Sequence, residues 1–240
     1  MKKAVVLLSS GLDSSANLAL GKDAGFEVTL ALTFDYGQKG AGKEILHAQR
    51  LCEYFGIEHH IFDFKNFSSL IGSKSALLSG KEEIPDLKRE SLDDLKAATK
   101  TAVAVWVPNR NGVLMNIAAA VAESRGIDAI VVGFNAEEAV TFPDNTPEFM
   151  DALTESLSFS TANKVTVMSA TDRLNKKEIV AKLEEKKFPF SMIWSCYRAE
   201  EKHCGQCESC NRLKRALETG IQSVEIRSKA IKEIFGENLL

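Results

Sequence analysis

The fold of this chain is decided close to its N-terminus by the stretch Val5-Val6-Leu7-Leu8-Ser9-Ser10-Gly11-Leu12-Asp13-Ser14-Ser15. Four consecutive apolar residues predict a short strand that is buried on both faces, and they are too few to cross a membrane. Apolar residues then recur at helical spacing over residues 12–24. We therefore expect a strand, a tight turn and a helix. The free N–H groups and the positive dipole end of such a helix together form an anion site.

The polar residues of this turn indicate which anion is bound. Ser9, Ser14 and Ser15 can add hydroxyl donors to the backbone N–H groups. Asp13 would repel a phosphate group unless a divalent cation lay between the two charges. The stretch therefore predicts a nucleotide bound with Mg²⁺. The alternative is an ordinary strand-to-helix turn of an α/β protein.

The stretch resembles the PP-loop motif, Ser-Gly-Gly-x-Asp-Ser, of the ATP pyrophosphatases. These enzymes cleave ATP between the α- and β-phosphates and transfer AMP to an oxygen of the substrate. Ser10 stands where the motif has Gly, and we expect its side chain to narrow the phosphate site. The predicted phosphate cradle consists of Ser9, Ser10, Gly11, Leu12, Asp13, Ser14 and Ser15, with Asp13 directed at Mg²⁺.

Length, composition and charge limit the class of protein. The 240 residues, 45% of them hydrophobic, can bury one large domain, or a domain and an appendage. A net charge of −3 gives no electrostatic reason to expect direct binding of nucleic acid. No signal peptide and no apolar run of spanning length is recognisable. We therefore expect a cytoplasmic protein that does not contact a membrane.

Four later segments have the composition of strands, and helical patterns separate them. Strands alternating with helices predict an α/β fold with a doubly wound parallel sheet, whose ligands lie at the carboxyl ends of the strands. Residues 67–106 fit this alternation poorly, and we interpret them as a mobile excursion, either a lid or a pair of solvated helices. The expected strands are residues 28–34, 60–64, 129–133 and 165–168, and the expected helices are residues 12–24, 41–55, 111–125, 147–163 and 175–186.

A second glycine-rich stretch, Gly37-Gln38-Lys39-Gly40-Ala41-Gly42-Lys43, has the spacing of a Walker A loop. The next residue is Glu44, whereas a Walker A loop needs a Ser or Thr hydroxyl there to hold Mg²⁺. We therefore interpret this stretch as a substrate loop.

Four of the five cysteines lie in one short segment, at Cys196, Cys204, Cys207 and Cys210. In a reducing compartment this crowding indicates a metal site and not disulfides. Four thiolates can close a tetrahedron around a structural Zn²⁺, and Gly205 allows a tight turn between them. An iron–sulfur cluster is the alternative.

The remaining cysteine and the nearby histidine receive simpler interpretations. Cys52 lies in a helical pattern, so we expect it to fill space in the core. His203 is a spare candidate ligand, and we expect it to be an exposed neighbour of the metal site. We then expect residues 1–190 to form the PP-loop domain and residues 191–240 to form a metal-binding segment, the metal segment, packed on it.

Together these motifs resemble the 7-cyano-7-deazaguanine synthase family, and the similarity extends from Lys2 to about Leu217. The resemblance implies an adenine nucleotide α-hydrolase-like fold of the Rossmann type and a homodimer. It also implies that ATP activates the carboxylate of 7-carboxy-7-deazaguanine, that ammonia gives an amide, and that a second activation gives the nitrile preQ0, a queuosine precursor. The motifs that carry the resemblance are Thr33-Phe34-Asp35-Tyr36-Gly37-Gln38, Val107-Pro108-Asn109-Arg110-Asn111, Val132-Gly133-Phe134-Asn135-Ala136-Glu137, Phe142-Pro143-Asp144, Leu174-Asn175-Lys176-Lys177-Glu178 and Trp194-Ser195-Cys196-Tyr197.

These motifs supply the other candidate site residues. Arg110 and Lys176 are candidates for binding phosphate or carboxylate charge, and an Arg can hold a carboxylate with two parallel hydrogen bonds. Surface ion pairs are the alternative for both cations. Glu137 and Asp144 are candidate acceptors for the amino face of a guanine-like base, although Asp144 has an alternative role in a cap or turn. The remaining substrate candidates are Tyr36, Gln38, Asn111 and Asn135.

Three loops depart from the family pattern, and they leave the acceptor of the activated carboxylate open. The chain has Gln38-Lys39-Gly40 for Gln-Arg-His, Pro108-Asn109-Arg110-Asn111 for Pro-Gly-Arg-Asn, and residues 140–146 for Ser-Gly-Tyr-Pro-Asp-Cys-Arg. One alternative function is therefore a ligase that passes the activated deazaguanine carboxylate to another amine, such as one on a protein partner in antiviral defence. A PP-loop enzyme that modifies tRNA is a third hypothesis.

Overall fold

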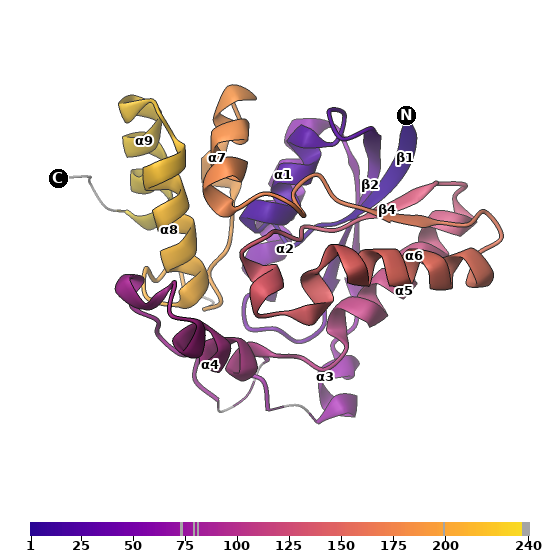
Figure 1. The fold of residues 1–240 in the computed structure, drawn as a ribbon, viewed down its shortest axis with the longest axis horizontal. Helices are drawn as coiled ribbons and strands as arrows, with labels where there is room; N and C mark the ends of the chain where they lie inside the picture. Colours follow the sequence, from indigo (N-terminus) through magenta and orange to yellow (C-terminus); the bar gives the residue numbers. More distant parts are fainter. Residues whose placement is uncertain (73, 79, 81, 199, 237–240) are drawn as a thin grey trace.

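The computed structural model describes residues 1–72, 74–78, 80, 82–198 and 200–236 (Figure 1). Within these ranges five parallel strands form one sheet in the order β3-β2-β1-β4-β5, so the predicted doubly wound α/β fold is confirmed. Each expected strand is present, and none of its ends lies more than three residues from the predicted one. The strands are β1 (Lys2–Leu7), β2 (Phe26–Asp35), β3 (Glu58–Asp63), β4 (Ala129–Val131) and β5 (Thr166–Met168).

Helices connect the strands and cover both faces of the sheet. Within the described residues all five helices expected from the sequence are present, together with four helices whose bounds were not predicted. The helices are α1 (Leu12–Leu20), α2 (Ala41–Phe55), α3 (Asn66–Ile71), α4 (Leu95–Val105), α5 (Arg110–Ser124), α6 (Pro147–Ser160), α7 (Lys176–Glu185), α8 (Glu208–Gly220) and α9 (Val224–Phe235).

Strand β1 is buried on both faces, which explains its apolar sequence. Val5 faces a core that includes Met115 of α5 and Leu157 of α6. Val6 faces the opposite core, which includes Cys52 of α2. Successive side chains of a strand point to opposite faces, so each apolar residue of the run packs against a different helical layer. Cys52 is buried as core filler, as predicted.

The chain builds a further helical layer from α7, α8 and α9, which stand beside α1 in Figure 1. Helices α8 and α9 lie after residue 190, where no helix was predicted. Leu213 and Leu217 recur at helical spacing and are buried against this layer, so the signal for α8 was present.

The excursion at residues 67–106 contains α3 and α4 and is packed against the rest of the protein. Leu77 and Leu78 are buried in the same core as β2 and α5. The backbone of Asp86 forms an isolated antiparallel β-bridge with that of Cys207, which lies in the metal segment. The segment therefore joins the sheet core to the metal segment, and residues 73, 79 and 81 of the expected excursion lie outside the described residues.

No helix in the described ranges has the length and apolar character needed to span a bilayer.

Candidate active site and metal centre

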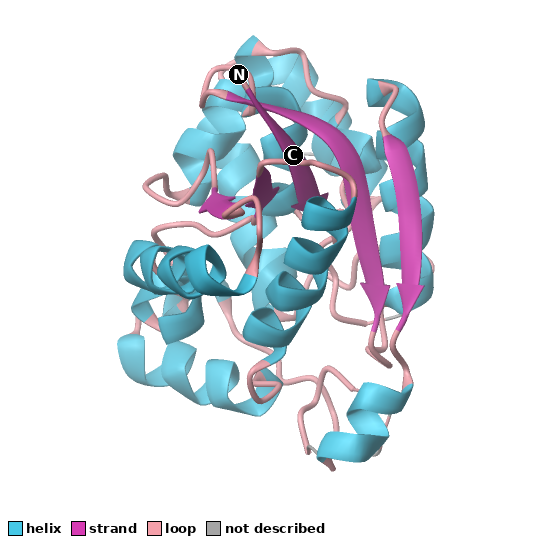
Figure 2. Ribbon diagram, turned by 90° about the vertical axis from the view of Figure 1, so that its right-hand side faces the viewer, coloured by secondary structure: helices cyan, strands magenta, loops and turns pink. Residues whose placement is uncertain are grey.

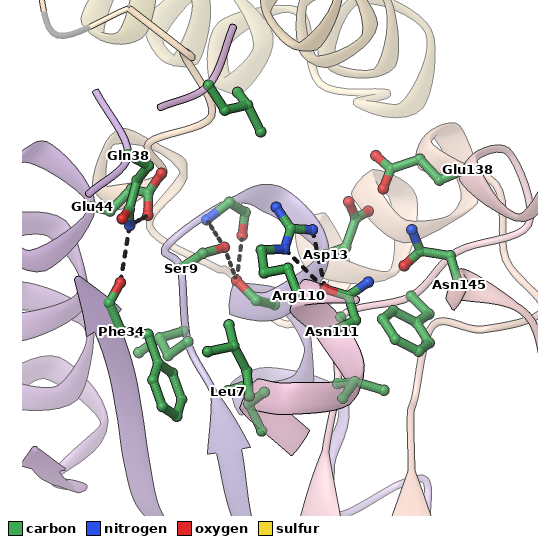
Figure 3. A pocket seen from close by; sticks show the side chains of 18 of the residues that line it. Leu7, Ser9, Asp13, Phe34, Gln38, Glu44, Arg110, Asn111, Glu138 and Asn145 are labelled. Atoms are coloured by element: carbon green, nitrogen blue, oxygen red, sulfur yellow. Dashed lines mark hydrogen bonds between the residues drawn. The ribbon is translucent and has the colours of Figure 1, made fainter. Parts of the chain in front are cut away.

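The parallel strands, drawn as magenta arrows in Figure 2, run in one direction through the sheet. One cavity of about 260 Å³ opens at the carboxyl ends of β1, β2 and β4 (Figure 3). Parallel strands end at the same edge, and the connection direction reverses between β1 and β4. Ligands of open α/β sheets bind at such a switch point. The cavity walls come from the turn after β1, the loop after β2, the start of α5, the loop after β4 and the segment before the cysteines.

The turn after β1 has the geometry expected of a phosphate loop. Helix α1 begins at Leu12, and its N-cap residue, Gly11, has no side chain that could cap the first turn. Ser9 and Ser14 approach each other with their hydroxyl oxygens 3.1 Å apart. Ser9, Gly11, Leu12, Asp13 and Ser14 all line the cavity. The open N-terminus of α1 therefore faces the cavity with its positive dipole end.

Ser10 adopts the left-handed backbone conformation, with φ at 59°. Its hydroxyl donates to the Ser9 carbonyl at 2.6 Å, and its side chain is fully buried and does not line the cavity. The expectation that Ser10 narrows the phosphate site is therefore wrong, because the left-handed turn points the side chain inward. Asn109, another replacement of a family glycine, also has a positive φ, of 51°. Both departures keep the backbone that glycine favours.

Gly133 explains how closely the loop after β4 approaches α1. A Cβ atom at Gly133 would lie 2.4 Å from the backbone nitrogen of Ser14. Only a residue without a side chain allows this approach.

A buried ion-pair cluster lies at the N-terminal end of α1. Lys176 Nζ is 2.6 Å from Asp13 Oδ2 and 2.8 Å from Glu138 Oε1. Burial raises the pKa of Asp13 to about 6, against the opposing effect of Lys176. Burial alone would lower the pKa of Lys176, but the two carboxylates raise it, so the ammonium stays charged. Lys176 is the first residue of α7, and a capping box formed by Asn175 and Glu178 fixes this first turn of the helix.

Asp13 also offers an acceptor for a metal ion. Its Oδ1 atom is buried and has no hydrogen-bond partner among the described residues. A carboxylate oxygen beside a phosphate loop is a ligand that Mg²⁺ prefers, since this ion binds one or two carboxylates together with substrate phosphates. The residues present therefore fit a Mg²⁺ ion that accompanies a bound nucleotide.

A second polar wall is centred on Arg110 at the start of α5. Arg110 donates to Tyr36 Oη at 3.2 Å and to Asn111 Oδ1 at 3.1 and 3.0 Å. Asn111 donates to the Asp144 carbonyl at 3.4 Å. All four residues line the cavity with Asp13 and Lys176, so the structure brings the PP-loop and most of the predicted substrate residues together.

Besides Ser10, three further residues predicted to bind ATP or substrate do not line this cavity. Ser15 is buried behind the loop, and its hydroxyl has no partner in the described part of the chain. Asn135 is buried, and its Oδ1 accepts from the backbone of Glu137 and Glu138. Glu137 points to α8, where its Oε2 lies 3.2 Å from both Arg212 and Arg215. In this structure Asn135 and Glu137 hold the loop that carries Glu138.

Some site residues were not found from the sequence. Glu138 was overlooked beside Glu137, because nothing in the sequence shows which of two adjacent carboxylates turns inward. Asn17 donates to the carbonyls of Asp13 and Val132 and accepts from the Ala170 backbone. It is a polar residue on a buried helix face, which was the available signal.

Trp106 and Phe142 were also missed, and both line the cavity. Their rings stack with centroids 6.2 Å apart and an interplanar angle of 11°. Such a pair offers a flat apolar surface to a planar ligand.

The glycine-rich stretch at residues 37–43 does not form a phosphate loop. Lys43 Nζ lies over the ring of Trp194, at 5.2 Å from its centroid. Gln38 is buried and bonds the Phe34 carbonyl and the Tyr36 backbone, while its amide donates to Glu44 at 2.8 Å. The stretch instead builds one wall of the cavity, to which Gln38 and Glu44 contribute.

The four clustered cysteines form a compact group that could hold a metal ion. Their sulfur atoms all lie within 4.8 Å of one another, and those of Cys204 and Cys210 are 3.8 Å apart. Sulfur atoms about 2.3 Å from a tetrahedral Zn²⁺ would be about 3.8 Å apart. Backbone N–H groups of Arg198 and Cys207 point at sulfur atoms of the group. The donor set therefore fits a closed, four-thiolate metal site.

The metal segment contacts the phosphate loop. The expectation that His203 is exposed is wrong, because its ring packs between Trp194 and Phe235 at 4.6 and 5.3 Å. Its Nε2 accepts from the Ser195 backbone at 3.0 Å. Ser195 Oγ in turn accepts from the Leu12 backbone at 3.4 Å.

Comparison with known proteins identifies similar chains. A family model for the queuosine biosynthesis protein QueC matches residues 3–220. A 7-cyano-7-deazaguanine synthase of Desulforamulus reducens is 50% identical over 213 residues, which cover 89% of this chain and 92% of that protein. A synthase of the same name from Pelotomaculum thermopropionicum is 48% identical over 221 residues, covering 92% and 99% of the two chains. The solved structure of NMN synthetase from Francisella tularensis is similar at a TM-score of 0.44 and 14% identity, over 97% of this chain and 82% of that one.

Proposed function

Because this chain belongs to the QueC family of queuosine biosynthesis proteins, we propose that it is an ATP-dependent carbon–nitrogen ligase that makes 7-cyano-7-deazaguanine. The substrate is the carboxylate of 7-carboxy-7-deazaguanine. Adenylation turns a carboxylate oxygen into a good leaving group, after which ammonia gives the amide. A second activation by ATP converts the amide to the nitrile.

The observation that carries this proposal is the meeting of the PP-loop and Arg110 in one cavity. Ser9, Gly11 and Ser14 would hold the phosphates with the N-terminus of α1. Arg110 would hold the substrate carboxylate through its planar fork. The enzyme then acts chiefly by fixing the two reactants in line and by stabilising charge on the transferred phosphoryl group.

Asp13 would hold Mg²⁺ through Oδ1, which has no hydrogen-bond partner among the residues that the structure describes. The ion supplies charge neutralisation at the phosphates. Lys176 fixes Asp13 in place and offers positive charge beside the phosphate loop.

The base of the substrate would lie against the stacked pair of Trp106 and Phe142. Asp144 supports this placement, since it lines the same part of the cavity and its Oδ1 atom has no partner within the described residues. Burial raises the pKa of Asp144, and a hydrogen bond from a base N–H group would satisfy that oxygen.

We propose that Cys196, Cys204, Cys207 and Cys210 hold a structural Zn²⁺ in the cytoplasm, where thiols stay reduced. Elemental analysis of the purified protein tests this assignment, and an iron–sulfur cluster would instead give visible absorption. The homodimer implied by the family resemblance remains a proposal that sedimentation analysis tests.

Transfer to a protein amine and modification of tRNA receive no support from the matched relatives, which carry the name of the synthase. The test of the proposed function is mass spectrometry of the protein incubated with ATP, Mg²⁺ and 7-carboxy-7-deazaguanine, with and without ammonium. We expect AMP and the nitrile, the latter only with ammonium. Absence of AMP formation with this acid would contradict the proposal.

A further inference from the structure

Glu44 is a cavity residue to which neither the sequence motifs nor the ATP chemistry assigns a role. It lies in the first turn of α2, and its carboxylate lines the cavity near Gly40. One oxygen, Oε2, accepts from Gln38 Nε2 at 2.8 Å. Gln38 is itself held by the Phe34 carbonyl and the Tyr36 backbone, so the orientation of Glu44 is fixed.

The proposed reaction needs a group of this kind, because ammonia is present as ammonium at neutral pH and its lone pair is then blocked. A carboxylate can attract the cation and accept the proton that must leave before attack. Asp13 and Glu138 are both paired with Lys176, so they are poorly suited to this task.

The position of Glu44 relative to Arg110 also fits the role. Glu44 and Arg110 line the same cavity, and the positive charge of Arg110 opposes the effect of burial, which raises the pKa of Glu44. Figure 3 shows Glu44 and Gln38 on one side of the space whose centre holds Arg110 and Asp13. A carboxylate bound by Arg110 would therefore present its carbon to an amine that enters beside Glu44.

The surroundings of Glu44 make it a competent proton acceptor near neutral pH. Burial raises the pKa of Glu44 to about 7, while Gln38 and Arg110 lower it and Asp35 raises it. A base whose pKa lies near the operating pH combines ionisation with proton affinity.

We infer that Glu44 binds the incoming ammonium and removes its proton, an inference that rests on the proposed function. Ammonium gives one proton to the Glu44 carboxylate and becomes ammonia. The nitrogen lone pair then forms the C–N bond to the adenylated carboxyl carbon, and the C–O bond to AMP breaks with its electron pair leaving on AMP. The second proton leaves the nitrogen to solvent, and Glu44 later releases the first.

The test compares ammonium with hydroxylamine as nucleophiles. Hydroxylamine is largely uncharged at neutral pH, so it needs no proton removed before attack, and it traps the adenylate as a hydroxamate. We expect Glu44→Gln to lower kcat/KM for ammonium by about 100-fold. The same variant should form hydroxamate within about twofold of the unmodified protein. Glu53→Gln, an exposed substitution on the same helix, is the matched control and should change neither rate.

Two outcomes would overturn the inference. One is an equal loss with both nucleophiles in Glu44→Gln, which would place Glu44 in adenylation or in folding. The other is a Glu44→Asp variant that keeps the carboxylate and is nevertheless as slow with ammonium as Glu44→Gln. If the unmodified protein forms no hydroxamate with 7-carboxy-7-deazaguanine, the proposed function itself fails, and this inference fails with it.

Discussion

The backbone N–H of Trp194 donates a 2.9 Å hydrogen bond to the carbonyl of Ser10. This bond joins the segment that carries Cys196 to the turn of the phosphate loop. The neighbouring contact from Leu12 to Ser195 Oγ reinforces the connection. The segment that carries Cys196 thus supports the turn after β1, although the cysteines do not line the cavity.

Removal of the metal should therefore weaken ATP binding. We expect chelation, or Cys207→Ser, to lower the affinity for ATP by at least tenfold, because the Trp194 and Ser195 contacts lose their anchor. Titration calorimetry with ATP and Mg²⁺ measures this effect, and circular dichroism checks that the sheet remains folded. Unchanged ATP affinity in the folded, metal-free protein would contradict the prediction.

Ser10 should tolerate glycine much better than a β-branched residue. Its φ of 59° costs a non-glycine residue on the order of 1 kcal/mol, so Ser10→Gly relieves strain but loses the hydroxyl bond to Ser9. We expect the free energy of unfolding of Ser10→Gly to stay within about 1 kcal/mol of the unmodified protein. Ser10→Val should cost more than about 2 kcal/mol. Urea unfolding decides this, and equal losses in the two variants would refute the argument.

Gly133→Ala should disturb the phosphate loop directly. The added Cβ would lie 2.4 Å from the Ser14 nitrogen, and neither backbone can yield easily. We expect a loss of stability of about 2 kcal/mol or more, together with weaker ATP binding. Gly42→Ala is the control, since a Cβ there meets nothing within 4 Å and alanine favours the helix. Unfolding curves that agree for both variants would show that the close approach is not tight.

Lys176→Met should destabilise the protein and raise the pKa of Asp13, because two buried carboxylates lose their cation. Asp13 and Glu138 would lose their shared cation, and a broken buried pair costs about 3–5 kcal/mol. The pKa of Asp13, already raised to about 6, should rise further, so the acid limb of adenylation should move to higher pH. Lys177→Met removes the exposed neighbouring charge and should change stability by less than about 0.5 kcal/mol. Denaturation at several pH values and pyrophosphate exchange measure the two effects.

Glu44 should make stability depend on pH. The pKa of Glu44 is about 7 in the folded protein, whereas an ordinary glutamate, as in the unfolded chain, has a pKa of 4.5. Between pH 4.5 and pH 7 the folded state therefore binds more protons than the unfolded state. The contribution of Glu44 to the free energy of unfolding therefore falls as pH rises from about 4.5 to about 7. In Glu44→Gln the side chain at position 44 does not titrate, so its contribution to the free energy of unfolding does not fall. The free energy of unfolding of this variant, relative to that of the unmodified protein, should therefore increase by up to about 3 kcal/mol from pH 4 to pH 8. A pH-independent difference would show that Glu44 titrates normally.

The sequence was informative where a local pattern has one structural solution. The apolar run before Ser9, the turn at Gly11 and the alternation of strands and helices predicted the sheet and the site at its edge. The four cysteines likewise predicted a cluster, because spacing through tight turns brings thiols together wherever the segment packs.

The sequence was misleading where the outcome depended on which way a side chain turns. His203 follows a charged run and reads as exposed, yet Trp194 and Phe235 enclose it. Glu137 and Glu138 are adjacent in the sequence. Glu137 pairs with Arg212 on α8 and Glu138 pairs with Lys176 on α7, and these two ion pairs decide which carboxylate faces the cavity.

By itself, then, the sequence determined the α/β class, the phosphate loop and the cysteine cluster, because each depends on neighbours along the chain. The tertiary structure decided that Lys176 neutralises Asp13, that Glu44 lines the cavity of Arg110, and that the metal segment supports Ser10. Each of these contacts joins residues far apart in sequence. Their formation depends on how the helices pack on the sheet, which no local spacing records.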